Sequence, residues 1–482
     1  MRLRIILCLL YLLSWSCNPS EKGKKAGTPN IVILLADDLG YGDLACYGGD
    51  AATPHLDQLA REGIRFTDFH SAAPNCSPSR AGMLTGRLPG KLGIYNYLPI
   101  GHPMHLPSEE ITIAEIAQLQ GYATAHFGKW HLSTLNADQN LAQPQPVDQG
   151  FEYSLGTSNN SMPSHLNPTN FIRNGSKVGE MTGYSCQIIV DEAKTWLTSL
   201  QPQDPFLMYL AFHEPHKKVA SPPELVNKYD HVSKPDAEYL ANVENMDLAI
   251  GRLLKYLDEH NLTENTLILF ASDNGSYRKG SNGDLLGGKS FVYEGGIRVP
   301  GILRWPEVIA PNQINHSPTS LIDIMPTICD ALQLPYPGKE AVDGTSLFPL
   351  FNGEEIIREK PLSWFFYRTY PQLALRHKNH IILASGLDTS HHTHPFAHDD
   401  MSYIKNLTLE EYELYDLNQD VEQSQDIFTD STAPTELMMS FAQNRLLEIQ
   451  KIGPTWNDLP ESVGNKKLKS EWRQLRPKGF SN

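Results

Sequence analysis

The sequence predicts an α/β protein in which helices flank a large mixed, mostly parallel sheet, followed by a smaller α+β unit with a short antiparallel sheet. Continuous apolar runs at 30–36, 206–212 and 266–271 are typical of parallel strands buried on both faces. Apolar residues within 236–259 recur at helical spacing, and alternating strands and helices imply parallel pairing. After residue 356, short strand-like runs follow one another without intervening helices.

Size and composition set the domain organisation. A chain of 482 residues exceeds one ordinary domain, and 40% apolar with 20% charged content is typical of a globular protein with a sizeable core. Pro and Gly accumulate at 335–353. We therefore expect a large domain over 28–355 and a C-terminal subdomain with a tail over 356–482.

The N-terminus carries the features of an export signal, which we assign to residues 1–17, with a linker over 18–27. Arg2 and Arg4 precede an apolar run that ends at Leu13 and is too short to span a bilayer. Cys17 directly after this region raises the alternative of a lipid-anchored protein, which stays open beside simple secretion. Both alternatives predict a protein outside the cytoplasm, either periplasmic or at the outer membrane and cell surface.

The charge of the chain excludes one class of partner. The formal charge is −15, and because residues 1–26 carry a net +4, the remainder carries −19. A surface of this sign repels nucleic acid, so we expect no nucleic-acid partner. An anionic substrate would need a local cluster of basic side chains.

Carboxylates follow two of the apolar runs. Asp37 and Asp38 end the first run, and Asp273 and Asn274 end the run at 266–271. One such pair could simply form a turn or cap a helix. Two pairs at the carboxyl ends of parallel strands would converge on the edge where open α/β sheets bind ligands. Oxygen ligands of this kind favour a hard cation, Ca²⁺ or Mg²⁺.

Cys76 is the residue around which the remaining motifs are arranged. Pro78 is typical of the first turn of a helix, so Cys76 is predicted at or just before a helix N-terminus, where anions bind. Arg80 follows one turn later, and its guanidinium can return to the cysteine side chain or to a bound anion. Taken alone, Cys76 could also be a buried structural cysteine. Only four cysteines follow the leader, which excludes a dense disulfide framework.

The segment from Cys76 through Pro78 and Arg80 to Ala81-Gly82-Met83-Leu84-Thr85-Gly86-Arg87 resembles the signature of the type I sulfatases. In that family the cysteine is oxidised enzymatically to Cα-formylglycine, whose hydrated aldehyde is the nucleophile. The resemblance covers roughly residues 28–335 and implies an alkaline-phosphatase-like fold. Further motifs appear in the family's order: Gly128-Lys129-Trp130-His131, His213-Glu214-Pro215, Asp273-Asn274-Gly275, Gly288-Lys289 and Glu294-Gly295-Gly296.

The resemblance implies a cation site and a set of catalytic residues. The metal ligands would be Asp37, Asp38, Asp273, Asn274 and the modified Cys76, and the ion would be Ca²⁺ rather than Mg²⁺. Arg80 and Lys129 would orient the formylglycine diol, and His131 would take a proton from its second hydroxyl as the sulfated enzyme collapses. His213 and Lys289 would contact the sulfate and the leaving oxygen, with His213 as the general acid. Without the resemblance, Lys129 and His131 could each be a surface residue. Because they are two positions apart in a segment predicted to be extended, their side chains would point to the same side of the chain.

The segments between these motifs are predicted from local signals. Ser108 can cap a helix that ends near Leu119, and a strand is expected at 122–127. Residues 132–180 are rich in Asn, Ser, Pro and Gln, and are expected to form loops over one side of the active-site edge. A helix is expected to start within 321–327.

The C-terminal part is expected to form a small antiparallel sheet closed by a helix near 434–450. Its strands are predicted at 364–367, 373–376, 380–384 and 413–417. Histidines 391, 392, 394 and 398 could suggest zinc, but their crowded spacing without thiolates favours a solvated loop. The basic segment 466–478 is interpreted as a solvated tail.

These inferences predict an exported sulfatase that hydrolyses sulfate esters of carbohydrates with a formylglycine and a divalent cation. It would need a formylglycine-generating maturation enzyme and would meet a membrane only through a lipid anchor. Two alternatives stay open: a phosphate or phosphonate monoester hydrolase of the same superfamily, and an inactive glycan-binding lipoprotein. The charge of −19 favours exo action on a terminal sulfated sugar over capture of a long polyanion. Candidate sugar-reading residues are Asn96, His102, His105, His165, Arg173 and Arg278.

Overall fold

A computed structural model describes residues 28–337, 342–386, 396–431, 433–456 and 459. The predicted export signal with Cys17, the linker, the histidines at 391–394 and the basic segment 466–478 lie outside these residues. Within them, no helix combines the length and apolarity that a membrane crossing requires. The four cysteines of the described chain are all free.

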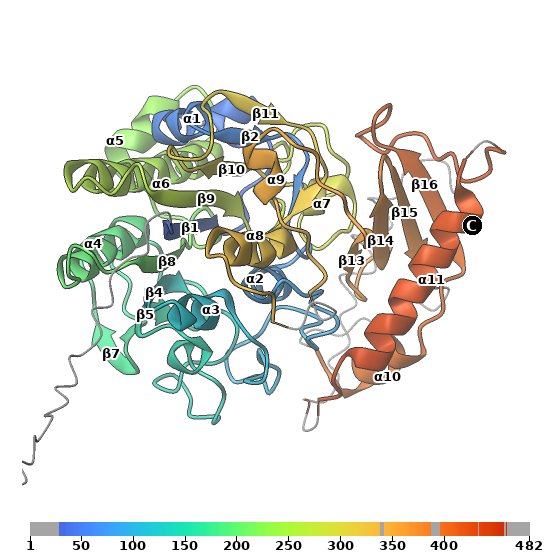
Figure 1. The fold of residues 1–482 in the computed structure, drawn as a ribbon, viewed down its shortest axis with the longest axis horizontal. Helices are drawn as coiled ribbons and strands as arrows, with labels where there is room; N and C mark the ends of the chain where they lie inside the picture. The colour runs from blue at the N-terminus through green and yellow to red at the C-terminus, as the bar shows by residue number, and fades with distance from the viewer. Residues whose placement is uncertain (1–27, 338–341, 387–395, 432, 457–458, 460–482) are drawn as a thin grey trace, which may run out of the picture.

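The large sheet runs in the order β11-β2-β10-β9-β1-β8-β4-β5-β6-β7, and its central strands β9, β1, β8, β4 and β5 are parallel (Figure 1). The antiparallel strand β10 separates β9 from β2, so the sheet is mixed but mostly parallel at its centre. This confirms the predicted fold class. The strands are β1 Asn30–Ala36, β2 Ile64–Phe66, β4 Ala123–Lys129, β5 Tyr153–Thr157, β6 Phe171–Arg173, β7 Ser176–Gly179, β8 Phe206–Ala211, β9 Thr266–Ser272, β10 Gly301–Arg304 and β11 Gln313–Asn315. A separate pair is formed by β3 Phe69–His70 and β12 Thr319–Ser320.

Strand β1 shows why the apolar runs are continuous. Ile31, Ile33 and Leu35 belong to the core under α2, α3 and α8, whereas Val32 and Leu34 belong to the core under α1, α4 and α6. The strand therefore needs apolar residues on both faces. The principal helices of this domain are α1 Pro54–Arg61, α2 Cys76–Thr85, α3 Ile113–Leu119, α4 Ser185–Thr198, α6 Lys234–Glu259 and α8 Ile324–Ala331. Shorter turns are α5 Pro223–Val226, α7 Glu294–Ile297, α9 Phe348–Phe351, η1 Ala45–Tyr47, η2 Pro146–Gln149, η3 Asn227–Tyr229 and η4 Leu321–Asp323.

Two local predictions were wrong. Helix α3 is capped by Thr112 rather than Ser108, because Thr112 and Glu115 form a reciprocal capping box. The segment 132–180 is not only loop, since it contains β5, β6 and β7. Strand β5 is short and rich in small residues, and it is fixed by pairing with β4 rather than by local preference.

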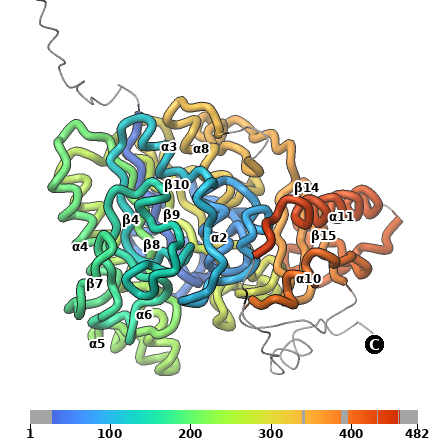
Figure 2. The backbone as a smooth tube through the Cα atoms, turned by 90° about the horizontal axis from the view of Figure 1, so that it is seen from below, coloured from blue at the N-terminus to red at the C-terminus, as the bar shows by residue number. Residues whose placement is uncertain are grey.

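The C-terminal subdomain contains the predicted antiparallel sheet and closing helix. Figures 1 and 2 show the small sheet and α11 at one end of the molecule. The order is β13-β14-β15-β16, and every neighbouring pair is antiparallel. The elements are β13 Leu362–Phe365, β14 Leu373–His377, β15 His380–Ser385, α10 His398–Asn406, β16 Glu411–Asp416 and α11 Thr435–Ile452.

Candidate active site

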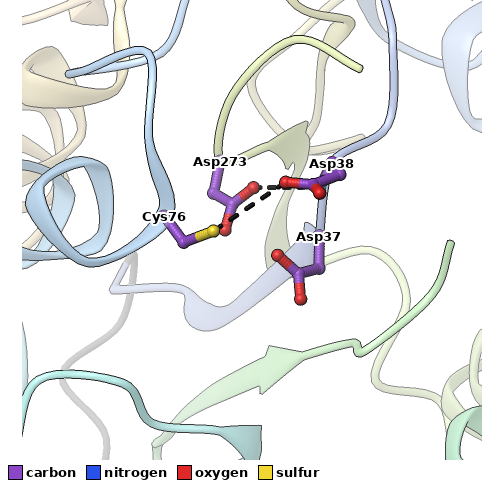
Figure 3. A group of neighbouring side chains, drawn as sticks. All are labelled: Asp37, Asp38, Cys76 and Asp273. Atoms are coloured by element: carbon purple, nitrogen blue, oxygen red, sulfur yellow. Dashed lines mark hydrogen bonds between the residues drawn. The ribbon is translucent and has the colours of Figure 1, made fainter. Parts of the chain in front are cut away.

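Parallel pairing of β1 and β9 brings the two predicted ligand pairs, Asp37 with Asp38 and Asp273 with Asn274, together. The register aligns Ala36 with Ser272, so the residues that follow both strands meet at one edge of the sheet. The backbone N–H of Asp38 donates to Oδ1 of Asp273 over 3.1 Å. Figure 3 shows Asp37, Asp38 and Asp273 facing the side chain of Cys76.

Cys76 is the first residue of α2, with Asn75 in the extended conformation before it. The predicted helix start is therefore confirmed. Its Sγ lies 3.8 Å from Oδ1 of Asp38, and the residue is 2% exposed. Burial raises the pKa of this thiol to about 12, although Lys129 and Lys289 oppose the shift. An unmodified Cys76 is therefore a neutral thiol at neutral pH, which is a weak nucleophile.

The donor set fits a hard cation. One potential ligand atom from each of Asp37, Asp38, Cys76 and Asp273 lies within 4.8 Å of the others, and all four residues are buried. In the described part of the chain, Oδ1 of Asp37 and Oδ1 of Asn274 are buried without a hydrogen-bond partner. The amide of Asn274 donates to Oδ1 of Asp38 over 2.8 Å, which leaves its own oxygen as the free acceptor. Buried oxygens of this kind require a partner, and Ca²⁺ or Mg²⁺ would supply it.

Arg80 serves the carboxylates rather than the cysteine. Its Nε and Nη2 donate to Oδ2 of Asp273 over 2.9 and 2.7 Å, and Nη2 lies 3.5 Å from Oδ1 of Asp37. The guanidinium thus holds the ends of β1 and β9 at a fixed separation. Burial, reinforced by the neighbouring carboxylates Asp37 and Asp38, raises the pKa of Asp273 to about 7 despite Arg80. A divalent cation would favour the ionised form of this carboxyl.

Two lysines, Lys129 and Lys289, lie next to the carboxylates of the site. Lys129 at the end of β4 donates to Oδ2 of Asp37 over 2.8 Å and to Oδ1 of Asn160 over 3.2 Å. Lys289 lies 2.7 Å from Oδ1 of Asp38 and 3.3 Å from Sγ of Cys76. Burial opposes ionisation of Asp37, but Lys129 and other nearby cations hold its pKa well below the ordinary value. The basic cluster that an anionic substrate requires is therefore present at the sheet edge.

His131 is positioned by a turn, not by an extended strand. Strand β4 ends at Lys129, and His131 has a left-handed backbone with φ 57°. Its Nε2 lies 3.0 Å from the carbonyl of Leu98, which can only accept, so the proton is on Nε2. Nδ1 is then the basic nitrogen, and among the described residues it has no partner. Burial, reinforced by Lys129 and Arg80, lowers the pKa of this imidazole well below its usual range.

His213 is buried, whereas a proton donor must be able to reach the substrate. It is fully buried, and Nε2 lies 2.8 Å from Oγ1 of Thr157. Thr157 donates its own proton to the carbonyl of Asn159 over 2.5 Å, so His213 must be the donor to Thr157. Burial, with a contribution from His165, lowers the pKa of His213 well below its usual range.

His216 is the site residue that sequence reasoning did not select. Its Nε2 lies 3.4 Å from Oδ2 of Asp38, and 18% of its side chain is exposed. Burial lowers its pKa, while Asp38 and Asp37 oppose the shift. The signal was present in the sequence, because a second histidine follows the end of the same strand β8. Which of the two faces the carboxylates was decided by the course of the chain after β8.

The predicted sugar-reading residues are mostly engaged elsewhere. Asn96, His102 and His165 are buried. Arg173 pairs with Glu192, and Arg278 pairs with Asp236. His105 contacts the carbonyl of Pro103 and the ring of Trp456.

Comparisons with known proteins agree with this geometry. A family model described as Sulfatase matches residues 29–334, and one described as N-sulphoglucosamine sulphohydrolase, C-terminal, matches 286–451. Arylsulfatase A of Homo sapiens is 33% identical over 464 residues, with 88% of each chain covered. N-acetylgalactosamine-6-sulfatase of Homo sapiens is 32% identical, covering 73% of this chain and 71% of its own length.

Solved structures show the same architecture. The crystal structure of Ps i-CgsB superposes with a TM-score of 0.77 at 25% identity, covering 93% of this chain and 97% of that one. A phosphonate monoester hydrolase of Agrobacterium radiobacter has the same fold, with a TM-score of 0.60 at 17% identity, covering 91% and 100%. The Sulfatase model spans more than half of the chain, and the relatives that this chain matches are sulfuric ester hydrolases. This chain therefore belongs to the sulfatase family, with an alkaline-phosphatase-like fold.

Proposed function

We propose that this protein is an exported, formylglycine-dependent sulfatase that hydrolyses sulfate esters of carbohydrates with one bound Ca²⁺. The observation that carries the proposal is the buried group of Asp37, Asp38, Asp273 and Cys76, surrounded by Arg80, Lys129 and Lys289. Its matched relative N-acetylgalactosamine-6-sulfatase supports a carbohydrate substrate, whereas the matched relative steryl-sulfatase of Mus musculus represents the alternative of a sterol. Export rests on the N-terminal leader pattern.

Two groups would supply the chemistry that side chains alone lack. A formylglycine at position 76 would supply, in its hydrated form, a hydroxyl nucleophile in place of the neutral thiol. A cation held by Asp37, Asp38, Asp273 and Asn274 would neutralise charge on the sulfate. The remaining functions belong to side chains of this chain.

Lys129 and Lys289 form a fixed cationic clamp on either side of the carboxylates. Lys289 lies 3.3 Å from Sγ of Cys76, so its ammonium can donate to a sulfate oxygen beside that residue. Lys129 is anchored by Asp37 and Asn160, and so reaches the same space in one orientation. Because these contacts exist before substrate binds, little reorganisation is needed when negative charge develops.

We assign proton transfer to His131 and His216. The free Nδ1 of His131 is suited to take a proton from the group at position 76. His216 is part-exposed beside Asp38, where a departing alkoxide would meet solvent, and a bound sulfate would favour its protonated form. Because Nε2 of His213 already donates to Thr157, we propose His216 as the general acid in place of His213.

The test is direct. The protein would be produced together with a formylglycine-generating enzyme, and sulfate and phosphate release would be measured from paired nitrophenyl esters and from sulfated oligosaccharides. We expect sulfate esters to be preferred, and we expect the peptide containing residue 76 to carry an aldehyde by mass spectrometry. Cys76→Ala should lose turnover, and exhaustive chelation should abolish it until Ca²⁺ is restored. A preference for phosphate, or full activity with unmodified cysteine, would contradict the proposal.

A further inference from the structure

The exposure of the charged side chains around Cys76 constrains where the substrate's sugar must sit. Arg80 and Lys129 have no exposed side-chain surface, and His131 and His213 are buried. His216 and Lys289 differ from these four residues, because 18% of each side chain is exposed. If the proposed function holds, the ester enters past these two residues, and the sugar rests on whatever lies beside them.

Tyr277 lies beside His216 at this entrance. It follows Asn274 by three residues and is 38% exposed. The centroids of the His216 and Tyr277 rings are 6.4 Å apart, with planes at 66° in an edge-on arrangement. The ring is therefore held at the rim, between the proposed proton donor and solvent.

Lys217 is held over the face of this ring. Its Nζ lies 4.4 Å from the centroid of Tyr277, within the range of a cation–π contact. Together with the His216 separation, this places the ammonium at most about 11 Å from the centre of the His216 ring, a distance that two linked sugar units can span. The aromatic face restricts where an otherwise flexible exposed lysine can point.

The charge of Lys217 is available, unlike that of Arg278 and Arg173. No carboxylate of the described chain forms an ion pair with Lys217, whereas Arg278 beside Tyr277 is paired with Asp236 and Arg173 is paired with Glu192. A cation at the rim that is oriented by an aromatic ring and not neutralised by an acid is suited to bind an anion. On a chain with a formal charge of −15, such a local cation is what draws an anionic group to this position.

We propose that Lys217, positioned by Tyr277, forms a subsite for a second anionic group on the substrate, next to the sulfate that is cleaved. The substrate class is then a sugar that carries a second sulfate ester or a carboxylate on the same unit or its neighbour. Lys217 binds that anion, and Tyr277 acts as a positioning residue. This inference rests on the proposed sulfatase function and narrows its substrate.

The experiment compares three oligosaccharides of equal length: one with a single sulfate, one with a second sulfate, and one with a carboxylate in place of that second sulfate. We expect the wild-type enzyme to show a kcat/KM about tenfold higher on at least one doubly anionic substrate, and the preferred one identifies the anion. The preference should shrink as NaCl is raised, because the pair is exposed to solvent.

Variants assign the preference to these residues. Lys217→Gln should reduce the ratio between doubly and singly anionic substrates to about one, and Tyr277→Leu should reduce it partly. Tyr277→Phe keeps the ring and should keep the ratio, and Lys218→Gln, the exposed neighbouring lysine, is the matched control that should also keep it. An unchanged ratio in Lys217→Gln, or a wild-type enzyme without any preference, overturns the subsite. The outcomes separate the two proposals: a wild-type enzyme that releases sulfate neither from nitrophenyl sulfate nor from any of the sulfated oligosaccharides refutes the sulfatase function itself, whereas sulfate release without any preference refutes only the subsite.

Discussion

At the scale of single residues, His213 and His216 lie three positions apart in the sequence but have different environments and therefore different chemistry. Both follow strand β8, yet His213 is fully buried and donates to Thr157, while His216 is part-exposed and faces Asp38. A general acid must reach the departing oxygen, and the buried histidine has already committed its proton.

We predict that His216→Ala slows substrates with alkyl leaving groups by about 10²-fold or more, and nitrophenyl sulfate much less, because only an alkoxide needs protonation. His213→Ala should instead slow both substrates to a similar extent and lower the melting temperature, since it removes a buried ring. Steady-state kinetics on paired alkyl and aryl sulfates would show the difference. The opposite pattern, with His213→Ala selective for alkyl esters, would restore His213 as the proton donor.

A further histidine controls stability rather than chemistry. His126 on β4 is fully buried among Trp130, Phe151 and Tyr209, and burial lowers its pKa to about 3. An imidazole in the unfolded chain has a pKa of about 6.5. Its contribution to folding is therefore complete above pH 6.5 and is lost as pH falls from 6.5 towards 3, because only the unfolded chain takes up the proton.

As the pH is lowered below 6.5, the free energy of unfolding should fall in both proteins. We predict that it falls by about 1.4 kcal/mol per pH unit more in the wild type than in His126→Gln. Other buried histidines add to the slope in both proteins, so the difference between them isolates His126. Urea unfolding at pH 7.5, 6.5 and 5.5 measures it. Parallel pH profiles would show that His126 is protonated in the folded state.

At the scale of elements, the start of the loop after β9 approaches the short helix α7 so closely that only glycine fits at position 275. A Cβ on Gly275 would lie 2.0 Å from the carbonyl oxygen of Gly295. The N–H of Gly275 also donates to the carbonyl of Gly296 over 3.0 Å. This contact sets the spacing between Asn274 and α7, which directly follows the segment that carries Lys289.

Gly275→Ala should therefore reduce kcat/KM by about 10²-fold, since a misplacement of about 1 Å at a site has this effect. It should also lower the melting temperature, because backbone must move. Gly280→Asn is the control: it lies in the same loop with open space around it, and Asn tolerates its left-handed backbone of φ 90°. Equal activity of the two variants would show that the spacing between this loop and α7 is not critical.

At the scale of the whole molecule, a buried ion network joins the small sheet to the active-site domain. Arg376 of β14 lies 2.6 Å from Oδ2 of Asp68, Arg298 lies 2.9 Å from Oδ1 of Asp68, and Arg298 also pairs with Glu294. Asp68, His70 and Glu294 have the arrangement of a second cation site, but two arginines already neutralise the two carboxylates. The group is therefore explained as a structural network. It anchors α7, which directly follows the loop of Lys289.

Arg376→Leu should destabilise the fold by roughly 3–5 kcal/mol, because it leaves two buried carboxylates, Asp68 and Glu294, with Arg298 as their shared arginine. Activity should fall at temperatures well below the unfolding transition, since the network supports the Lys289 loop. Arg252→Leu, which breaks a surface pair with Asp191, is the control and should change the melting temperature little. Calorimetry with activity at matched temperatures would test both, and an Arg376 variant as stable as the control would refute the coupling.

The parallel core, the helix start at Cys76 and the carboxylates at the ends of β1 and β9 could all be predicted from the amino-acid sequence. These features follow from local rules: burial on both faces demands continuous apolar runs, proline marks a first helical turn, and parallel strands deliver their carboxyl ends to one edge. The structure decided what depends on contacts between distant segments. The small strand β5 exists because β4 pairs with it, and Arg80 turned to Asp273 because the end of β9 lies there. Whether His213 or His216 lies at the exposed edge of the site depends on how deeply each is buried after the sheet has been covered by helices and loops. The residue pattern around β8 does not determine that burial.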